Sequence, residues 1–350
     1  MGIGQEKIFI EKLDELFEKT TKSAMIHECI MHVENGSGDF TWSRGYGERT
    51  IDSIMNIASI TKLYTTTCII NLIQQGKLSL DEKLSKFFSP EILDGIHIYK
   101  GIDYSYQITV GNLLFQNSGF PDVFAVGRNN LNRRMVKEDL KLTLEDYVKI
   151  AKESKKKFPP GTKGKAHYSD LNFEMLGKII ELKEGSSLHD AYKKYVFLPL
   201  QLQNTYLMEK EDDYCANVYY KRKALKRPNL LASIPACGGC ISTSKEVMTF
   251  IKAFFNGQLF DRSIFEELRY FNTIQYCPPL GQYGGGIVRL NISGIASMYR
   301  LKGELIGHMG GTGTYAYYYP EKDLYFVGDV NQFARPALIF TLPLQKAKLA

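Results

Sequence analysis

The distribution of strand-forming and helix-forming segments along the chain most constrains its fold. Residues 24–35 and 40–49 are rich in strand formers and are joined by Gly36-Ser37-Gly38-Asp39, which is typical of a hairpin. Helical patterns at 5–20, 59–75, 109–120, 143–157, 171–185 and 243–257 follow the apolar spacing of amphipathic or buried helices. Strand patterns return after residue 283, at 284–290, 296–310 and 313–330. We therefore expect an α/β (α+β) fold in which both ends of the chain form one mixed, mainly antiparallel sheet flanked by helices, with a large, mostly helical subdomain inserted.

The length of 350 residues allows one large domain, 1–350, with an insertion. We expect an α/β subdomain at about 1–58 and 240–350 and a helical subdomain at about 59–239. The form of the last segment, 333–350, is left open, because Pro336 and Pro343 weaken a helical pattern there.

The composition places few demands on partners. The net charge of +6 comes largely from the basic runs 152–157 and 219–228, which we interpret as solvated loops or helix faces, so no nucleic acid is expected. No stretch of 18 apolar residues predicts a membrane span. The chain as given lacks a signal-peptide pattern and is expected to be cytoplasmic, or secreted or periplasmic if a leader has been removed.

Neither a metal ion nor a cofactor is expected. Cys237-Gly238-Gly239-Cys240 has the spacing of a zinc or redox pair, but no second pair or nearby His cluster completes it. Small buried cysteines in a glycine-rich turn are the preferred interpretation. The chain has no Walker A pattern and no His-Glu-x-x-His.

The spacing Ser-x-x-Lys occurs at three places: Ser59 with Lys62, Ser154 with Lys157, and Ser242 with Lys245. On a helix this spacing puts an amine beside a hydroxyl, and a buried amine can then take the proton of a nucleophilic serine. Two of the pairs lack apolar surroundings. Ser154 and Lys157 lie in a lysine-rich run, and Ser242 and Lys245 lie where a serine or threonine caps the following helix.

Ser59 differs because it stands at the start of an apolar helix, where the helix dipole favours developing negative charge. The alternative is that Ser59 merely caps the helix while Lys62 points to solvent. This stretch by itself does not choose between the two.

Five stretches, 57–84, 113–120, 158–185, 237–250 and 305–332, together resemble the penicillin-recognising serine hydrolases in the family's order over nearly the whole chain. That family comprises class C β-lactamases, D-alanyl-D-alanine carboxypeptidases, D-aminopeptidases and related esterases. The resemblance implies a β-lactamase/transpeptidase-like fold. It also implies that Ser59 is the acylated nucleophile, that Lys62 helps to deprotonate it, and that Tyr168 shares the role of base and then protonates the leaving group.

Two positions depart from the family pattern. Asp170 stands where the family has an asparagine, and a carboxylate there could pair with Lys62 or contact a cationic substrate. His308-Met309-Gly310 replaces Lys-Thr-Gly, so that His308 takes the place of the cation that attracts a substrate carboxylate. Met309 removes the hydroxyl of the threonine.

The glycines of this last motif also have expected roles. The resemblance implies that Gly311 supplies one N–H of the oxyanion hole and Ser59 the other, while Gly310 lets substrate approach the strand. We expect a serine hydrolase that acts through an acyl-enzyme on an ester or amide, of esterase or D-amino-acid peptidase type, with a small molecule or short peptide as substrate. The alternatives are a true β-lactamase and a non-catalytic, penicillin-binding receptor-like protein.

Overall fold

A nine-stranded sheet forms the centre of the computed structural model, which describes residues 3–275, 281–293 and 301–350. The strand order is β2-β1-β16-β15-β14-β13-β12-β11-β6, and every pairing is antiparallel except that of β11 with β6. The strands are β1 (Cys29–Asn35), β2 (Thr41–Tyr46), β6 (Lys165–Ala166), β11 (Asn272–Ile274), β12 (Gly281–Gly284), β13 (Ile287–Asn291), β14 (Glu304–Met309), β15 (Thr314–Tyr319) and β16 (Leu324–Asp329).

The two ends of the chain meet in this sheet, as predicted. β1 pairs with β16 in a register that runs from Ile30 opposite Asp329 to Asn35 opposite Leu324. The expected hairpin at residues 36–39 joins β1 to β2. The pattern at 296–310 yields β14, and its residues 296–300 lie outside the described residues. The short edge strand β6, which comes from the middle of the chain, was not predicted.

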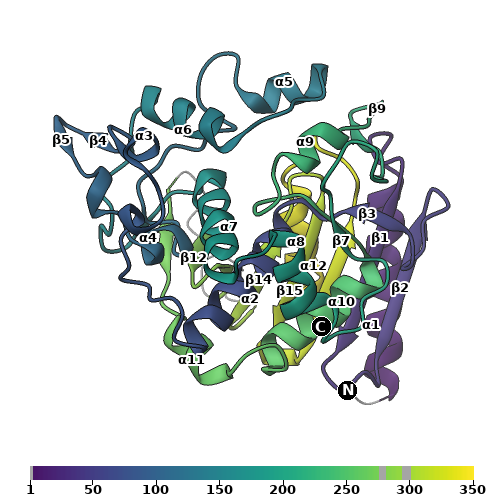
Figure 1. Ribbon diagram of the computed structural model, residues 1–350. Coiled ribbons are helices and arrows are strands. Elements are labelled where there is room, and N and C mark those ends of the chain that lie inside the picture. The colour runs from purple at the N-terminus through teal and green to yellow at the C-terminus, as the bar shows by residue number, and fades with distance from the viewer. Residues whose placement is uncertain (1–2, 276–280, 294–300) are drawn as a thin grey trace.

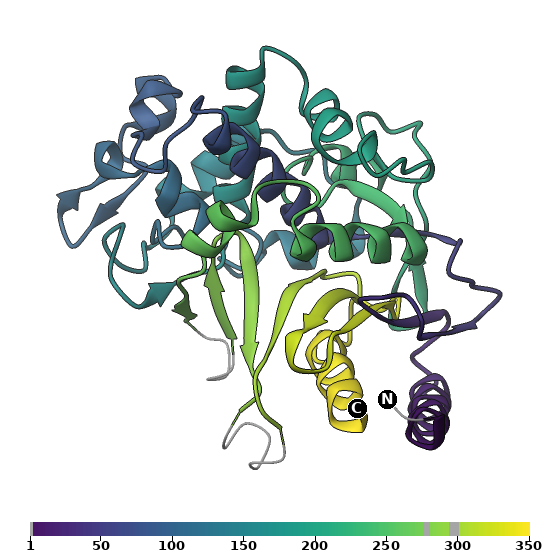
Figure 2. The ribbon, with the colours of Figure 1, turned by 90° about the horizontal axis from the view of Figure 1, so that it is seen from below.

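Helices cover both faces of the sheet (Figure 2). α1 (Ile3–Thr21) and α12 (Leu338–Leu349) pack on one face, and α10 (Ser244–Asn256) packs on the other. α12 forms although Pro343 lies inside it, because Leu342 and Ala347 are buried against the sheet. That burial offsets the hydrogen bond that proline cannot make.

The remaining elements form the helical part of the molecule and small accessory sheets (Figure 1). The helices are α2 (Thr61–Gln74), α3 (Pro90–Leu93), α4 (Val110–Leu114), α5 (Leu131–Lys137), α6 (Leu144–Glu153), α7 (Asp170–Glu184), α8 (Leu188–Tyr192), α9 (Pro228–Ala232) and α11 (Arg262–Glu267). The accessory strands are β3 (Ile54–Asn56), β10 (Cys240–Thr243) and β7 (Tyr206–Leu207) in one sheet, with the hairpins β4 (Ile98–Tyr99) to β5 (Ile102–Asp103) and β8 (Val218–Tyr220) to β9 (Lys223–Leu225).

The helical pattern at 109–120 is realised only in part. α4 ends at Leu114, and Gln116 then adopts a left-handed backbone conformation with φ of 52°. The rest of this stretch is a loop. Its side chains turn out to hold the segment that precedes α7, as described below.

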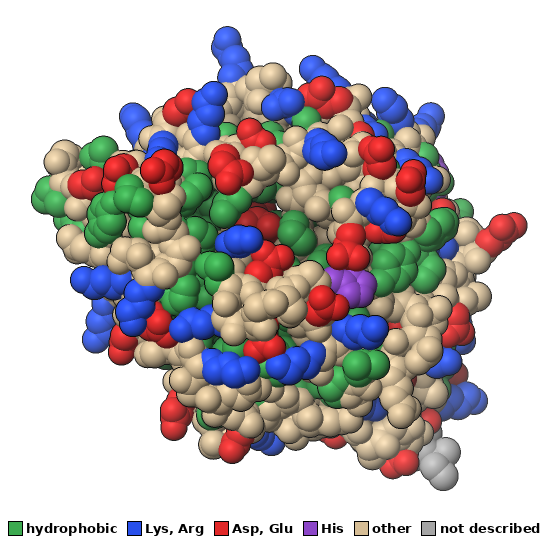
Figure 3. All heavy atoms as spheres, viewed as in Figure 1, with side chains coloured by type: hydrophobic (Ala, Val, Ile, Leu, Met, Phe, Trp, Pro, Cys, Tyr) green, Lys and Arg blue, Asp and Glu red, His purple; other side chains and the backbone are tan. Residues whose placement is uncertain are grey.

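The basic run at 152–157 is less solvated than expected. Lys156 is buried, and its ammonium donates hydrogen bonds to the carbonyls of Ala151, Lys152 and Ser154 at the end of α6. Lys221, Arg222 and Lys223 in the second run are exposed. On the face shown in Figure 3, lysine and arginine side chains alternate with aspartate and glutamate, so no single-sign patch dominates that face.

Candidate active site

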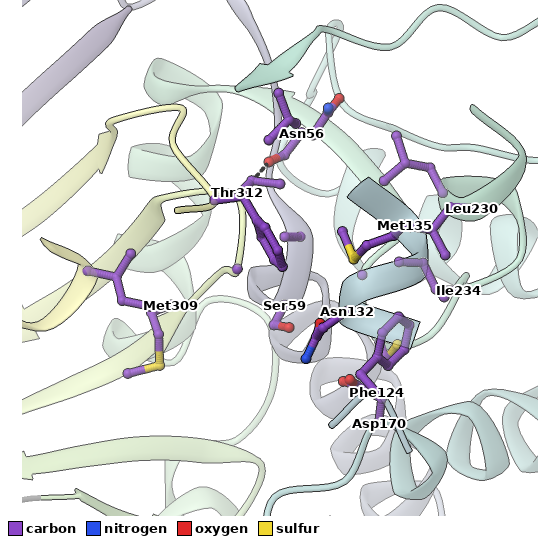
Figure 4. Close-up of a pocket in the computed structure, with 18 of the residues that line it drawn as sticks. Asn56, Ser59, Phe124, Asn132, Met135, Asp170, Leu230, Ile234, Met309 and Thr312 are labelled. Carbon is purple, nitrogen blue, oxygen red and sulfur yellow. Dashed lines mark hydrogen bonds between the residues drawn. The ribbon is translucent and has the colours of Figure 1, made fainter. Parts of the chain in front are cut away.

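Ser59 lies in a short turn, η1 (Ala58–Ile60), between β3 and α2. Ala58 has φ of 46°, a conformation that costs a non-glycine residue about 1–3 kcal/mol and is typical of functional sites. Two hydroxyls fix this segment. Thr312, in the turn between β14 and β15, donates to the Asn56 carbonyl at 3.0 Å (Figure 4). Thr314, the first residue of β15, donates to the Ile57 carbonyl at 3.0 Å. The serine is therefore held at the junction of the sheet and the central helix α2.

Lys62 is the second residue of α2 and has no exposed surface. Its ammonium carries three N–H donors, and each has an acceptor: Ser59 Oγ at 3.1 Å, Asp170 Oδ1 at 2.6 Å and the Cys237 carbonyl at 2.7 Å. The side chain of Ser59 caps neither η1 nor α2. The alternative in which Ser59 is a cap and Lys62 points to solvent is therefore wrong.

Neither of the other two Ser-x-x-Lys pairs lies within one helix. Ser242 is buried in β10, but the Lys245 side chain is 62% exposed and pairs with Asp52. Thr243 caps α10 by accepting a hydrogen bond from the Glu246 N–H, as the sequence indicated for this stretch. Ser154 follows the last residue of α6.

The charge state of Lys62 depends on Asp170. Burial lowers the pKa of the Lys62 ammonium, but the charge and hydrogen bond of Asp170, together with Cys237 and Tyr283, leave that pKa above its usual value. Lys62 and Asp170 thus form an ion pair between a buried ammonium and a carboxylate at the cavity wall, one of the two roles that the sequence left open for this carboxylate. In this state Lys62 donates to Ser59 instead of accepting its proton.

Tyr168 lines the same cavity as Ser59, and its ring centroid lies 4.9 Å from the Lys62 ammonium. Burial and the negative charge of Asp170 hold the pKa of its phenol well above the ordinary value, and a hydrogen bond with Ser59 only partly offsets them. The phenol is therefore protonated at neutral pH and is placed to donate a proton.

The loop after α4 positions Tyr168 and Asp170. Gln116 Oε1 accepts a hydrogen bond from the Ser169 N–H at 2.9 Å, and Ser169 Oγ donates to the Pro121 carbonyl at 2.7 Å. These contacts come from the stretch 113–120 and the residue after it, which explains why that motif accompanies the Ser-x-x-Lys pair.

Glu174 and the backbone of Cys237 support Lys62, a role that the sequence analysis did not predict. Glu174 is buried, and its Oε1 accepts a hydrogen bond from the Cys237 N–H at 2.9 Å, while the Cys237 carbonyl receives the Lys62 ammonium. Burial raises the pKa of Glu174 to about 7. The sequence did offer a signal for Glu174, because it lies four residues after Asp170 and so on the same face of α7. Cys237 and Cys240 are buried free thiols, as the preferred interpretation held.

His308 has a different setting from the one that the resemblance implied. Its side chain is fully buried, with Nδ1 next to the backbone of Met309 and Nε2 3.3 Å from the Tyr283 hydroxyl. Burial, followed by the charge of Lys62, lowers the pKa of His308 to about 3, so the imidazole is neutral. It offers no positive charge to a substrate carboxylate, and Met309 faces the cavity in its place.

A cavity of about 360 Å³ opens over Ser59 (Figure 4). Its lining is mostly apolar, and Asp122 and Asp170 are its acidic members. Burial and the charge of Asp170 raise the pKa of Asp122 to about 6. Gly311 lines the cavity beside Ser59, a place suited to an oxyanion N–H, whereas Gly310 packs on the Ser59 turn.

Among the described residues, no helix is long and apolar enough to cross a membrane, and no group of His, Cys, Asp or Glu side chains is arranged to hold a metal ion.

Comparison with known proteins agrees with this fold. The profile of the family described as Beta-lactamase matches residues 34–346, and the chain belongs to this family. It is 28% identical over 228 residues to the D-alanyl-D-alanine-carboxypeptidase/endopeptidase AmpH of Escherichia coli K12, a match that covers 63% of this chain and 56% of AmpH. The chain thus spans about half the length of the curated relatives it matches.

Solved structures share the whole fold. EstCE1, a hydrolase with promiscuous acyltransferase activity, superposes with a TM-score of 0.79 at 17% identity over 99% of both chains. The D-amino acid amidase of Ochrobactrum anthropi SV3 superposes with a TM-score of 0.76 at 17% identity, over 99% of this chain and 98% of the amidase. These likenesses confirm the predicted mixed sheet with its helical insertion.

Proposed function

We propose that this protein hydrolyses a small ester or amide through an acyl-enzyme at Ser59. The contact between Ser59 Oγ and the buried Lys62 ammonium, at the floor of an apolar cavity, carries this proposal. Gly311 and Ser59 supply the N–H groups that stabilise the oxyanion as the carbonyl carbon bonds to Ser59 Oγ.

Asp170 gives Lys62 a way to act as a base. Transfer of one proton from Lys62 to Asp170, across 2.6 Å, leaves a neutral amine that takes the Ser59 proton as the new bond forms. Tyr168 then donates its proton to the leaving group and regains one from the protonated Lys62. Water attacks the acyl-enzyme in the second half of the reaction and releases the acid.

The cavity favours neutral or amine-bearing substrates over carboxylates. Arg227 is its one cationic lining residue among those described, and its guanidinium is engaged with backbone carbonyls. His308 is neutral, and Asp122 and Asp170 repel an anion. This supports an esterase or a D-amino-acid amidase type over a true β-lactamase, whose substrates carry a carboxylate. Asp122 in the cavity specifically favours the amidase type, because it can pair with a free amine.

A fluorophosphonate probe tests the nucleophile, and a substrate panel tests the class. Wild-type protein is expected to be labelled and Ser59→Ala to remain unlabelled, whereas absence of labelling in both would support the receptor-like alternative. A p-nitrophenyl ester and a D-alanyl p-nitroanilide are expected to be hydrolysed faster than a chromogenic cephalosporin. The reverse order would identify a β-lactamase.

A further inference from the structure

Arg227 joins the two short helices α5 and α9, both of which line the cavity over Ser59. This residue precedes α9, and its guanidinium reaches across to the end of α5: Nε donates to the Met135 carbonyl at 2.5 Å and Nη2 to the Val136 carbonyl at 3.1 Å. The last carbonyls of a helix lack partners within it, so Arg227 satisfies groups that α5 leaves open.

Asp139 makes the reverse connection. It follows α5, and its carboxylate accepts hydrogen bonds from the N–H groups at the start of α9: Asn229 N at 3.0 Å and Leu230 N at 3.0 Å. The Asn229 side chain adds a third, at 3.1 Å. Each helix is thus capped by a residue that neighbours the other, and we call Arg227 and Asp139 together the α5–α9 latch.

Both sides of the latch carry walls of the cavity over Ser59. Met135 on α5 and Leu230 on α9 both line it, and Figure 4 shows them close to one another above Ser59 with Ile234 beside them. Phe124 and Asn132, also from the segment that carries α5, line the side nearer Asp170. α5 and α9 are short and come from segments about 90 residues apart, so their separation is set by contacts between them and not by chain connectivity.

We propose that Arg227 and Asp139 are positioning residues that fix the width of this cavity and thereby select the size of the apolar group that a substrate places between α5 and α9. This inference rests on the proposed hydrolase function. The selected group is a compact apolar chain or ring, because Met135 of α5 faces Leu230 of α9 across the cavity. Neither latch residue takes part in proton transfer.

Two series of esters test the latch. One is a set of p-nitrophenyl esters with acyl chains from acetyl to decanoyl, and the other is a set of acetate esters with alcohols of rising length. Asp139→Ala, Arg227→Met and the double variant are compared with Glu138→Ala. Glu138 is the matched control, because it is an exposed carboxylate next to Asp139 that pairs with Arg134 and does not line the cavity.

Each latch variant is expected to raise kcat/KM for the longest substrate relative to the shortest by at least 10-fold in one of the two series, mainly through KM. Glu138→Ala is expected to keep the wild-type ratio. The double variant is expected to shift the ratio little beyond either single change, because both break one unit.

An equal loss of activity for every chain length would show that the latch only stabilises the fold and would overturn the inference. If the larger changes prevent folding, the ratio is measured instead with Asp139→Asn and Arg227→Lys, which keep part of the hydrogen bonding. Fluorophosphonate labelling of wild-type protein separates the two proposals. Absence of labelling contradicts the hydrolase function, whereas an unchanged ratio in labelled variants contradicts the latch alone.

Discussion

The Lys62 ammonium lies 2.6 Å from the Asp170 carboxylate inside the protein, while it also donates to Ser59 Oγ. The anion stabilises the charged amine, so the group expected to act as base is held in its protonated form. Burial and the charge of Asp170 raise the pKa of Tyr168 as well. Asp170 therefore favours the protonated form of both groups that flank Ser59.

Replacement of Asp170 by asparagine should move the acidic limb of catalysis to higher pH. In the wild type Lys62 becomes a base by passing its proton to Asp170, so the pair works while Lys62 is protonated and Asp170 is charged. Asparagine cannot accept that proton, and Lys62 in the variant acts only after its own proton has gone to solvent. We expect the acidic limb of kcat/KM for ester hydrolysis to shift up by about 1–3 pH units. Asp122→Asn is the matched control, since Asp122 lines the same cavity without a hydrogen bond to Lys62. An unchanged limb, or one shifted downward, would contradict the role given to Asp170.

Glu174 should add its own ionisation to the same profile. Its pKa of about 7 predicts an inflection near neutral pH in kcat/KM, as a negative charge develops beside the Cys237 peptide that holds Lys62. Glu174→Gln keeps an acceptor for the Cys237 N–H and should abolish the inflection with little loss of rate. Glu174→Ala removes that acceptor and should lower kcat/KM by up to about 10²-fold through misplacement of Lys62. If Glu174→Gln and Glu174→Ala had the same kcat/KM, Glu174 would not hold Lys62 in place through the Cys237 peptide.

Gly310 should be intolerant of any side chain. A Cβ there would lie 2.2 Å from Thr314 Oγ1 and 2.7 Å from the Ile57 carbonyl, so Gly310→Ala must push β14 away from the Ser59 turn. We expect a loss of about 1–3 kcal/mol in the free energy of unfolding, with slower labelling of Ser59 by fluorophosphonate. At Gly311 the nearest atom to a new Cβ is 3.8 Å away, so Gly311→Ala should unfold like wild type. Denaturant titration of both variants checks the difference, and similar stabilities would refute it.

Lys346 should make stability depend on pH. It is buried in α12 with the Tyr315 hydroxyl as hydrogen-bond partner, and burial lowers its pKa to about 7. The unfolded amine titrates near 10.4, so the folded protein binds fewer protons between about pH 7 and 10.4 and gains stability as pH rises through that range.

Lys346→Met should remove this dependence and stabilise the protein at pH 7 by about 1–4 kcal/mol, with a smaller gain at pH 10. The exposed Lys348, two residues further on, gives the control Lys348→Met, which should match wild type at both pH values. Urea titrations at pH 7 and pH 10 provide the comparison. A variant less stable than wild type at pH 7 would show that the ammonium is stabilising.

The sequence was sufficient for the fold and for the contact between Ser59 and Lys62. The hairpin at 36–39 and the return of strands after residue 283 predicted a sheet closed by both chain ends, and the apolar helix after Ser59 distinguished it from Ser154 and Ser242. The ion pair of Lys62 with Asp170 was one of two foreseen outcomes. These features are local, or depend on alternation and helical spacing that can be read along the chain.

Features made by segments distant in sequence could not be read in this way. Glu174 matters because Cys237 lies against it. His308 loses its charge because the surrounding core excludes water and because the charge of Lys62 opposes a second cation. The latch joins Asp139 to Asn229, and neither residue belongs to a recognisable pattern. α12 was left open because a proline inside a helix is unfavourable locally, and tertiary burial reversed that balance.

The central claim is that Ser59 forms the acyl-enzyme, and trapping that species tests it most directly. Wild-type protein is quenched in acid during turnover of a p-nitrophenyl ester, digested and examined by mass spectrometry. We predict the mass of the acyl group on the peptide that contains Ser59, accumulation of the adduct in wild type, and no adduct in Ser59→Ala. An acyl group on Ser154 or Ser242, or turnover that continues in Ser59→Ala, would contradict the account.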